Sequence, residues 1–160
     1  MDDIIEQLAS RLEARGYTLA TAESCTGGRI AAAITAWPGC SSFYKGGVVA
    51  YSNEVKMNLL HVCRETLDSF GAVSAQTVRE MVAGAMAAIG ADCAVATSGI
   101  AGPGGGSPEK PVGTIWMAAA VRGKEPLVFC QSGDEGRESN ACRAAKRALE
   151  LLLQALDAQK

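Results

Sequence analysis

Apolar residues recur along this chain with two different periods, one typical of helices and the other typical of strands. The clearest helical segment opens at Ser74 and closes at Gly90, and its apolar positions from Val78 to Ile89 follow the 3.6-residue period. The same spacing marks a first helix that Asp2 or Asp3 caps, and a long last helix. We predict helices at about residues 2–15, 29–36, 54–60, 74–89 and 140–155.

Short apolar or alternating segments between these helices are typical of strands. We predict strands at residues 17–22, 47–51, 93–97, 112–121 and 127–130, the last two forming a hairpin that turns at Gly123. Strands that alternate with helices tend to pair in parallel, whereas a hairpin adds an antiparallel pair. We therefore expect an α/β fold, a three-layer α/β/α sandwich with a mixed parallel and antiparallel sheet. No repeat or long linker divides the chain, so residues 1–160 are expected to form a single domain.

Composition narrows the class of protein further. The chain has 160 residues, 48% of them hydrophobic, and carries 15 Lys and Arg against 17 Asp and Glu, a net charge of −2. A protein that binds nucleic acid through its backbone charge is normally basic, so no nucleic-acid partner is expected. The longest apolar run, Ile115 to Val121, is far shorter than the roughly 20 residues of a membrane span. The acidic start of the chain is typical of a helix, not of a signal peptide. We expect a soluble, cytoplasmic protein with no membrane partner.

Six cysteines are scattered along the chain, and none forms a C-x-x-C pair. In a chain long enough to build a core, such cysteines are expected to be small, reduced, mostly buried residues rather than a disulfide framework. His61 is the only histidine, and it lies in an apolar run where a packed or surface residue is expected. This leaves no spaced ligand set for zinc and no histidine for a Ser-His-Asp triad. Any serine nucleophile here would therefore use a lysine as its base.

Ser24 follows the first predicted strand and stands just before Gly27 and Gly28, which open the next helix. A strand-to-helix turn exposes a side chain and leaves backbone N–H groups free to bind a ligand. Glycine lets that ligand approach the main chain closely. Ser24 is therefore a candidate nucleophile; the alternative is that Ser24 or Thr26 only caps the helix.

Tyr51 and Lys56 stand at a second strand-to-helix turn, where both side chains can face one cleft. Lys56 falls in the first turn of the helix, where the positive end of the helix dipole disfavours its charge. A lysine that acts as a base needs its pKa lowered from about 10.4 towards ~7–8. The alternative is an exposed helix lysine beside an ordinary strand tyrosine.

A glycine- and proline-rich loop follows the strand at 93–97 and extends to Pro111. It is not a Walker A phosphate loop, because no Lys-Ser or Lys-Thr pair follows the glycines. Pro108 and Pro111 also block the helix that a dinucleotide-binding fingerprint requires. Ser98 and Gly99 can still form one wall of a ligand site; the alternative is a long turn in a crossover connection.

Three segments together resemble the signature blocks of the CinA C-terminal domain family: Thr21–Gly28, Gly47–Lys56 and Ser98–Gly105. The resemblance runs from the first predicted helix to the last and implies a stand-alone, single-domain form of the family. The activity it implies is nicotinamide-nucleotide amidohydrolysis, or NMN deamidase activity. In that reaction nicotinamide mononucleotide (NMN) and water give nicotinate mononucleotide and ammonia.

The resemblance matches Ser24 to a serine nucleophile, and Tyr51 and Lys56 to the apparatus of the base. Backbone N–H groups near Thr26 to Gly28, or of Gly99, would hold the oxyanion. The expected substrate-binding residues are Thr26, Gly27, Gly28, Ser41, Ser98, Gly99 and Arg137. The implied chemistry requires no metal and no cofactor, and its partner is a small pyridine nucleotide.

One block departs from the family pattern, which is Gly-Asp-Arg followed by a second arginine. Here Glu135 and Gly136 separate Asp134 from Arg137, and Ala141 stands where the second arginine is expected. An arginine fork is the natural partner of a nucleotide phosphate, so Arg137 is the expected phosphate contact. The altered block also motivates an alternative, a catalytically silent nucleotide-binding or regulatory module of the same family. The resemblance further suggests a homodimer.

Overall fold

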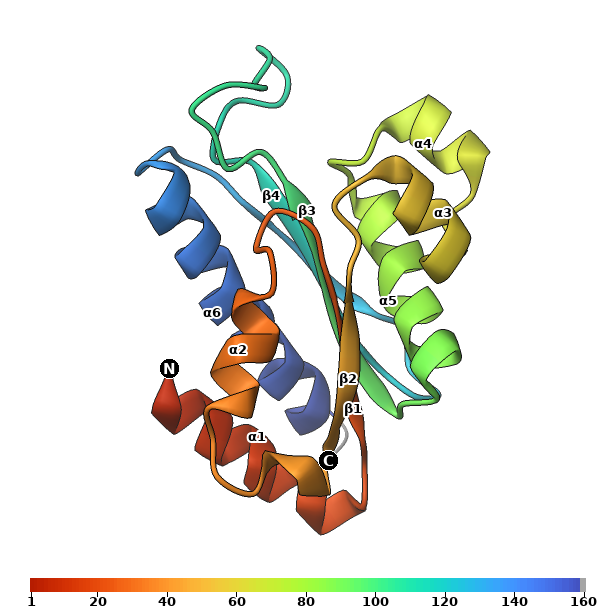
Figure 1. Cartoon of the computed structure of the whole chain (residues 1–160), viewed down its shortest axis with the longest axis vertical. Coiled ribbons are helices and arrows are strands. Elements are labelled where there is room, and N and C mark those ends of the chain that lie inside the picture. Colours follow the sequence, from red (N-terminus) through yellow and green to blue (C-terminus); the bar gives the residue numbers. More distant parts are fainter. Residues whose placement is uncertain (159–160) are drawn as a thin grey trace.

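The computed structural model describes residues 1–158, and it places one five-stranded sheet between two layers of helices (Figure 1). Strand order across the sheet is β2-β1-β3-β4-β5. β1 pairs in parallel with β2 and β3, whereas β4 is antiparallel to both β3 and β5. The predicted three-layer sandwich with a mixed sheet is confirmed. The strands are β1 (Leu19–Glu23), β2 (Tyr44–Val49), β3 (Cys93–Gly99), β4 (Ile115–Val121) and β5 (Leu127–Gln131).

Helices α1, α2 and α6 cover one face of the sheet, and α3 and α5 cover the other (Figure 1). The short helix α4 packs on α5. Within residues 1–158, no helix has both the length and the apolar composition needed to cross a membrane. The helices are α1 (Asp2–Arg15), α2 (Arg29–Thr35), α3 (Asn53–Leu60), α4 (Arg64–Phe70), α5 (Ala75–Ile89) and α6 (Arg137–Asp157), with a 3-10 turn η1 (Cys40–Ser42) before β2.

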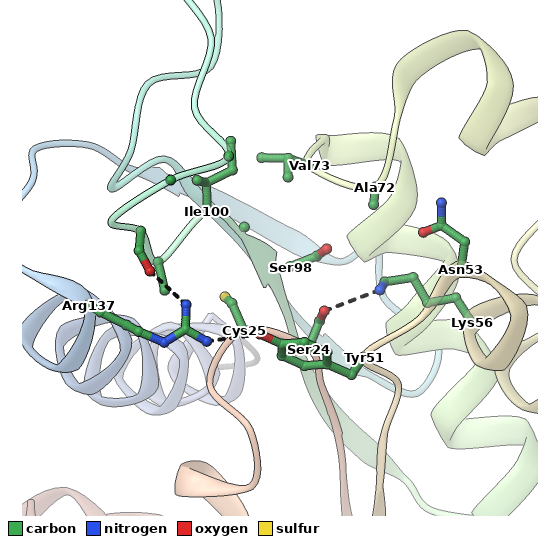
Figure 2. Close-up of a pocket in the computed structure, with 15 residues that line it drawn as sticks. Ser24, Cys25, Tyr51, Asn53, Lys56, Ala72, Val73, Ser98, Ile100 and Arg137 are labelled. Atoms are coloured by element: carbon green, nitrogen blue, oxygen red, sulfur yellow. Dashed lines mark hydrogen bonds between the residues drawn. The ribbon is translucent and has the colours of Figure 1, made fainter.

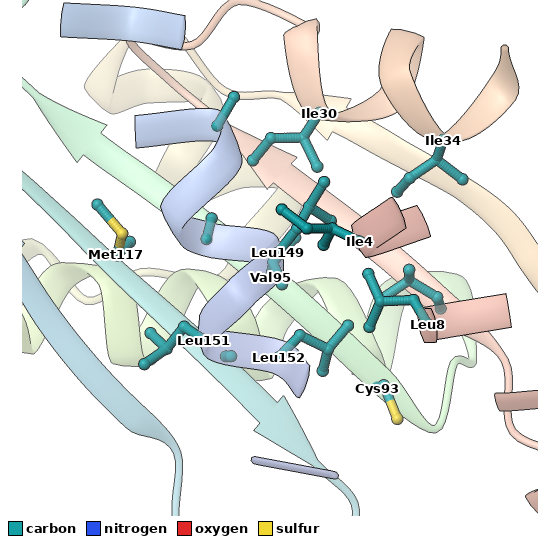
Figure 3. Close-up of a cluster of buried hydrophobic side chains, with 14 of the residues drawn as sticks. Ile4, Leu8, Ile30, Ile34, Cys93, Val95, Met117, Leu149, Leu151 and Leu152 are labelled. Atoms are coloured by element: carbon teal, nitrogen blue, oxygen red, sulfur yellow. The ribbon is translucent and has the colours of Figure 1, made fainter. Parts of the chain in front are cut away.

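Each layer of helices buries its own apolar cluster against the sheet. Figure 3 shows the first cluster, in which Leu8 of α1, Ile30 of α2 and Leu149 of α6 meet side chains of the central strands. The second cluster lies under α5, where Val78, Met81 and Val82 are fully buried. Burial of this apolar surface is the main favourable term in folding, and it holds the strand ends in fixed positions.

Several bounds differ from the expectation: β4 begins at Ile115 and not at Val112, and α6 begins at Arg137 and not at Asn140. Two further differences have clear physical reasons. Strand β2 begins at Tyr44, three residues before the predicted Gly47, and Gly46 and Gly47 lie inside it. A Cβ at Gly47 would lie 2.0 Å from the Thr21 hydroxyl, which bonds to the Tyr44 hydroxyl, so glycine serves packing here and does not break the strand. Helix α4 was not predicted, because none of its side chains is buried and it has no apolar period to detect.

The close contact between α3 and α5 fixes the position of α3. A Cβ at Gly84 of α5 would lie 1.9 Å from the backbone oxygen of Leu60 at the end of α3. Glycine therefore allows the two helices to approach more closely than any other residue would permit. This contact places the start of α3 beside the carboxyl ends of β1 and β2.

Candidate active site

A pocket of about 290 Å³ lies at the carboxyl ends of the parallel strands. The chain passes from β1 to β2 on one side and later returns to β3 on the other side of β1. Ligands of open α/β sheets usually bind where the strand order reverses in this way. The pocket is enclosed by the turn after β1, the start of α3, the connection from α4 to α5, the loop after β3 and the start of α6.

Ser24 and Lys56 meet in this pocket (Figure 2). The Lys56 Nζ lies 3.1 Å from the Ser24 Oγ and donates a second bond of 2.8 Å to the Ala50 carbonyl oxygen. Only 2% of Lys56 is exposed, so the alternative of an exposed helix lysine is wrong. Burial lowers the pKa of Lys56 from its ordinary value, while the nearby Cys25 opposes that shift. The lowered pKa raises the fraction of neutral amine, which is the form that can accept a proton.

Backbone hydrogen bonds and a helix cap fix the positions of Ser24 and Lys56. The Ser24 N–H donates to the Thr97 carbonyl oxygen at 3.0 Å, which extends the pairing of β1 with β3 by one residue. Helix α3 begins at Asn53 because the Ser52 Oγ caps it and accepts from the Val55 N–H at 3.1 Å. Lys56 then falls in the first turn of α3, with its amine directed back towards the end of β1.

Glu23 caps α2, and neither Ser24 nor Thr26 does so. The buried Glu23 carboxylate accepts hydrogen bonds from the Thr26 hydroxyl at 2.6 Å and from the Gly28 N–H at 3.1 Å. It also accepts from the next two free N–H groups of the helix, those of Ile30 and Ala31. The alternative that Ser24 or Thr26 is the helix cap is therefore wrong, and the Ser24 side chain is left for the pocket.

Arg137 and Tyr51 meet at the side of the pocket opposite Lys56 (Figure 2). The Arg137 guanidinium donates to the Gly102 carbonyl oxygen at 2.6 Å and to the Tyr51 hydroxyl at 3.0 Å. Tyr51 is 58% exposed, and its hydroxyl makes no hydrogen bond with Ser24 or Lys56 among the contacts of residues 1–158. The two extra residues before Arg137 therefore do not remove it from the pocket.

The remaining expected residues divide into two groups. Ser98 and Gly99 line the pocket, and the Ser98 side chain is buried beside Ser24 at the end of the neighbouring strand. Thr26, Gly27 and Gly28 do not line it, because they form the closed turn that Glu23 holds. Ser41 lies in η1, which precedes β2 and is therefore at the opposite end of the sheet.

Several pocket residues carried no role in the sequence analysis. Asn53 stands one helical turn before Lys56 on the same face of α3, a spacing that could have identified it. Ala72 and Val73 come from the connection between α4 and α5 and face Ile100 across the pocket (Figure 2). No pattern in the sequence distinguishes Ala72 or Val73, because their position depends on the undetected α4.

Charge in the pocket has one sign. Its basic side chains are Lys56 and Arg137, and none of the described residues that line it is Asp or Glu. Small apolar walls and a few polar groups with defined directions are typical of a small-molecule site. The arrangement can hold an anionic ligand and present a hydroxyl with a neighbouring amine to it.

Comparison with known proteins gives matches over nearly the whole chain. The CinA C-terminal domain matches residues 1–156. Nicotinamide-nucleotide amidohydrolase PncC of Escherichia coli (strain K12) is 49% identical over 151 residues, which are 93% of this chain and 90% of that protein.

Solved structures agree with this match. The competence/damage inducible protein CihA from Agrobacterium tumefaciens gives a TM-score of 0.92 at 42% identity, covering 97% of this chain and 94% of that one. The competence damage-inducible protein A (ComA) from Klebsiella pneumoniae subsp. pneumoniae MGH 78578 gives 0.90 at 43% identity, covering 99% and 98%. The similarity therefore extends to both sequence and fold.

Proposed function

Because this chain belongs to the CinA C-terminal domain family, we propose that it is a nicotinamide-nucleotide amidohydrolase. In this proposal it hydrolyses the carboxamide C–N bond of NMN to give nicotinate mononucleotide and ammonia. The observation that carries the proposal is the contact of 3.1 Å between the Ser24 Oγ and the buried amine of Lys56 inside a pocket. A hydroxyl with an adjacent base is the arrangement that nucleophilic amide hydrolysis requires.

The proposed reaction has two halves. Ser24 Oγ attacks the carboxamide carbon while the neutral Lys56 amine takes the hydroxyl proton. Lys56 then returns this proton to the leaving nitrogen, the C–N bond breaks, and ammonia departs. Water attacks the resulting ester with Lys56 again as the base, which releases nicotinate mononucleotide and restores Ser24.

The lowered pKa of Lys56 supports its place in both halves. An amine at its ordinary pKa of about 10.5 is almost wholly protonated near neutral pH and accepts no proton. Burial lowers the pKa and so increases the fraction of neutral amine. The hydrogen bond to the Ala50 carbonyl oxygen keeps the amine directed at Ser24. A lysine base of this kind needs no histidine, which agrees with the exposed position of His61 outside the pocket.

In this proposal Arg137 binds the nucleotide phosphate and the apolar walls hold the pyridine ring. Arginine suits phosphate because its planar fork gives paired, charge-assisted hydrogen bonds. Ile100 and Val73 face each other across the pocket and offer apolar surface to a flat ring (Figure 2). Tyr51 supports the Arg137 end of the site, since its hydroxyl bonds to Arg137 while Lys56 reaches Ser24 without a relay.

The alternative, a silent nucleotide-binding or regulatory module, was motivated by the altered spacing around Arg137. Arg137 nevertheless lines the pocket, so no specific observation now favours this alternative. We also propose a cytoplasmic location, since all six cysteines are free, as is usual in a reducing compartment. The small pyridine nucleotide remains the proposed partner, and the homodimer remains a proposal.

Ammonia release from NMN by the purified protein, followed with a coupled assay, tests this function. We expect stoichiometric ammonia and nicotinate mononucleotide, at a rate that a chelator such as EDTA does not change. Saturable NMN binding with no product after long incubation would instead support the silent module. Absence of both binding and turnover would refute the pyridine-nucleotide assignment altogether.

A further inference from the structure

The loop between β3 and β4 borders the pocket, and its two parts are held differently. Its base is fixed, because the Ile100 N–H donates to the Thr114 carbonyl oxygen at 2.9 Å and the Gly113 N–H donates to the Ile100 carbonyl oxygen at 2.8 Å. Its outer part, Pro103–Glu109, is exposed throughout and projects beyond the sheet (Figure 1). Exposed segments with few contacts are the mobile parts of a fold. The outer part therefore needs a tether if it is to form a defined wall.

This outer part of the loop contributes to the pocket. Gly104 and Gly105 line it together with Ile100, and a Cβ on Gly105 would lie 3.7 Å from the Ile100 side chain. Ile100 is one of the two apolar residues proposed above to hold the pyridine ring, and Val73 is the other. Because Gly104 and Gly105 are exposed while they line the pocket, they form its rim beside Ile100. The position of this rim determines how closely the ring is enclosed.

One side chain joins the outer part of the loop to the rest of the fold. The Lys110 Nζ donates to the carbonyl oxygen of Phe70, the last residue of α4, at 2.6 Å. Among the hydrogen bonds of residues 1–158, this is the only one that runs from residues 103–110 to another element. The turn that carries Lys110 is itself closed, since two hydrogen bonds of 2.9 and 3.0 Å join Ser107 to Lys110. The Lys110 bond therefore holds this turn and, through it, the adjacent glycines.

The acceptor of this bond is well placed and firmly held. The last carbonyl groups of a helix have no partner within it, and a cation at that end also interacts favourably with the helix dipole. A hydrogen bond of 2.8 Å from the Thr66 hydroxyl to Glu80 fixes α4 to α5. The hydroxyls of Ser74 and Thr77 both donate to the Gly71 carbonyl oxygen, which fixes the connection that follows α4. Lys110 thus joins a loosely held loop to a firmly held wall.

Side-chain packing does not replace this bond. A hollow of about 420 Å³ lies where Lys110 crosses to α4, and Phe70, Val73 and Trp116 line it together with Lys110. Val73 lines this hollow as well as the active-site pocket. The loop and α4 are therefore joined across the hollow by the Lys110 bond rather than by interlocked side chains.

We propose that Lys110 is a positioning residue for the substrate: its bond to the end of α4 holds the rim at Gly104 and Gly105 in place over the pyridine ring. This inference rests on the proposed function. Lys110 does not line the active-site pocket, so it acts through the loop and does not touch the substrate. Without the bond, the outer part of the loop must be ordered when the substrate binds, and the entropy cost of that ordering weakens binding. The contact of Ser24 with Lys56 is unchanged, so the chemical step keeps its rate.

Lys110→Met removes the donor and nearly keeps the length of the side chain. KM for NMN is expected to rise about ten-fold with kcat within about two-fold of the parent, because the lost hydrogen bond supports binding and not the chemical step. KM for nicotinamide riboside should rise by the same factor, since both substrates carry the pyridine ring. Lys110→Arg, which can still donate to Phe70, should restore both KM values.

Lys45→Met is the matched control. The Lys45 Nζ donates to the Gly90 carbonyl oxygen at the end of α5, at 2.8 Å, so this variant also loses a bond from a lysine to the end of a helix. Lys45 lies outside the pocket, so KM should stay close to that of the parent. An equal rise in KM for Lys45→Met would overturn the positioning role, as would an unchanged KM for Lys110→Met. A rise for NMN alone would also overturn it, because Lys110 would then be a phosphate contact.

A measurement without turnover separates this inference from the proposed function. In the free protein, the heteronuclear NOE of the Gly104, Gly105 and Gly106 amides reports their motion on the ps–ns timescale. It should fall in Lys110→Met and not in Lys45→Met, and equal values in both variants and the parent would overturn the tether. If the parent releases no ammonia from NMN, the proposed function fails and the positioning of its substrate fails with it, whereas the tether is decided by the NOE alone.

Discussion

At the residue scale, the environment of Lys56 determines whether it can act as a base. Its amine is buried without a carboxylate partner among the contacts of residues 1–158, and it bonds only to a hydroxyl and a carbonyl oxygen. Desolvation of this kind penalises the charged form and lowers the pKa. The same desolvation also lowers the unfolding free energy when Lys56 is charged, so its effect can be measured from protein stability without an assay of activity.

Lys56→Met removes the buried amine and should change how stability depends on pH. Because the folded-state pKa of Lys56 is lowered, the unfolded chain binds more protons between that value and about 10.5, and stability rises with pH across this window. The unfolding free energy of the parent minus that of Lys56→Met should therefore increase as the pH rises towards about 10.5, by at most about 1.4 kcal/mol per pH unit. Urea titrations at several pH values measure this difference. The same increase for Lys45→Met, which removes an exposed lysine, would contradict the role of burial.

Arg137→Met tests the proposed phosphate contact. We expect KM for NMN to rise about ten- to a hundred-fold, because a charge-assisted hydrogen bond contributes roughly 1.5–3 kcal/mol. KM for nicotinamide riboside, which lacks the phosphate, should change little. Arg143→Met is the matched control, since Arg143 lies on the same helix but outside this pocket. An equal rise in KM for both substrates would assign Arg137 to another part of the site.

At the scale of elements, single buried contacts hold the two strand-to-helix corners. Glu23→Gln replaces an acceptor of four hydrogen bonds by an amide whose NH₂ opposes the N–H groups of α2. We expect the unfolding free energy to fall by about 2–4 kcal/mol, from lost charged hydrogen bonds and the lost charge at the helix terminus. Glu138→Gln also removes a carboxylate at a helix start, but an exposed one, so its effect in the same urea titration should be smaller. Equal effects would contradict the capping role of Glu23.

Gly84→Ala should disturb the corner that carries Lys56. Alanine favours an exposed helix over glycine by about 1 kcal/mol, but here its Cβ would overlap the Leu60 carbonyl oxygen. We expect a net loss of about 1–3 kcal/mol of stability and a lower kcat, because α3 must move. Ala83→Gly on the exposed side of α5 should lower the unfolding free energy by only about 1 kcal/mol, because glycine has a lower helix propensity than alanine, and it should leave kcat unchanged. A stabilised Gly84→Ala protein with full kcat would show that the contact is not tight.

The elements that sequence predicted well are those whose burial follows from a local pattern of apolar residues. Helix α5 is buried with the helical period, strand β3 is a short continuous buried run, and both were predicted within about two residues. Helix α4 has no fully buried side chain, and β2 contains Gly47, whose role is set by Thr21 on the neighbouring strand. Such features depend on contacts between distant segments, which no local pattern records.

At the scale of the whole molecule, the sheet topology brings together segments that are distant in sequence. Ser24, Lys56 and Ser98 lie at or just beyond the carboxyl ends of three parallel strands, and their placement at one edge could be expected from that alternation. The direct contact of Ser24 with Lys56 could be anticipated as a shared cleft, but not as a distance. The Glu23 cap and the Arg137–Tyr51 contact could not be anticipated from the sequence, because each depends on how a side chain packs between elements.

The central claim is that Ser24 is the nucleophile of an amide hydrolysis, and the most direct test is the rate of ammonia release from NMN by Ser24→Ala. The variant should fold with the parent's circular dichroism spectrum and melting temperature, while kcat falls by at least about 10³-fold, as when other serine hydrolases lose their nucleophile. A folded Ser24→Ala protein that releases ammonia within ten-fold of the parent rate would contradict the account.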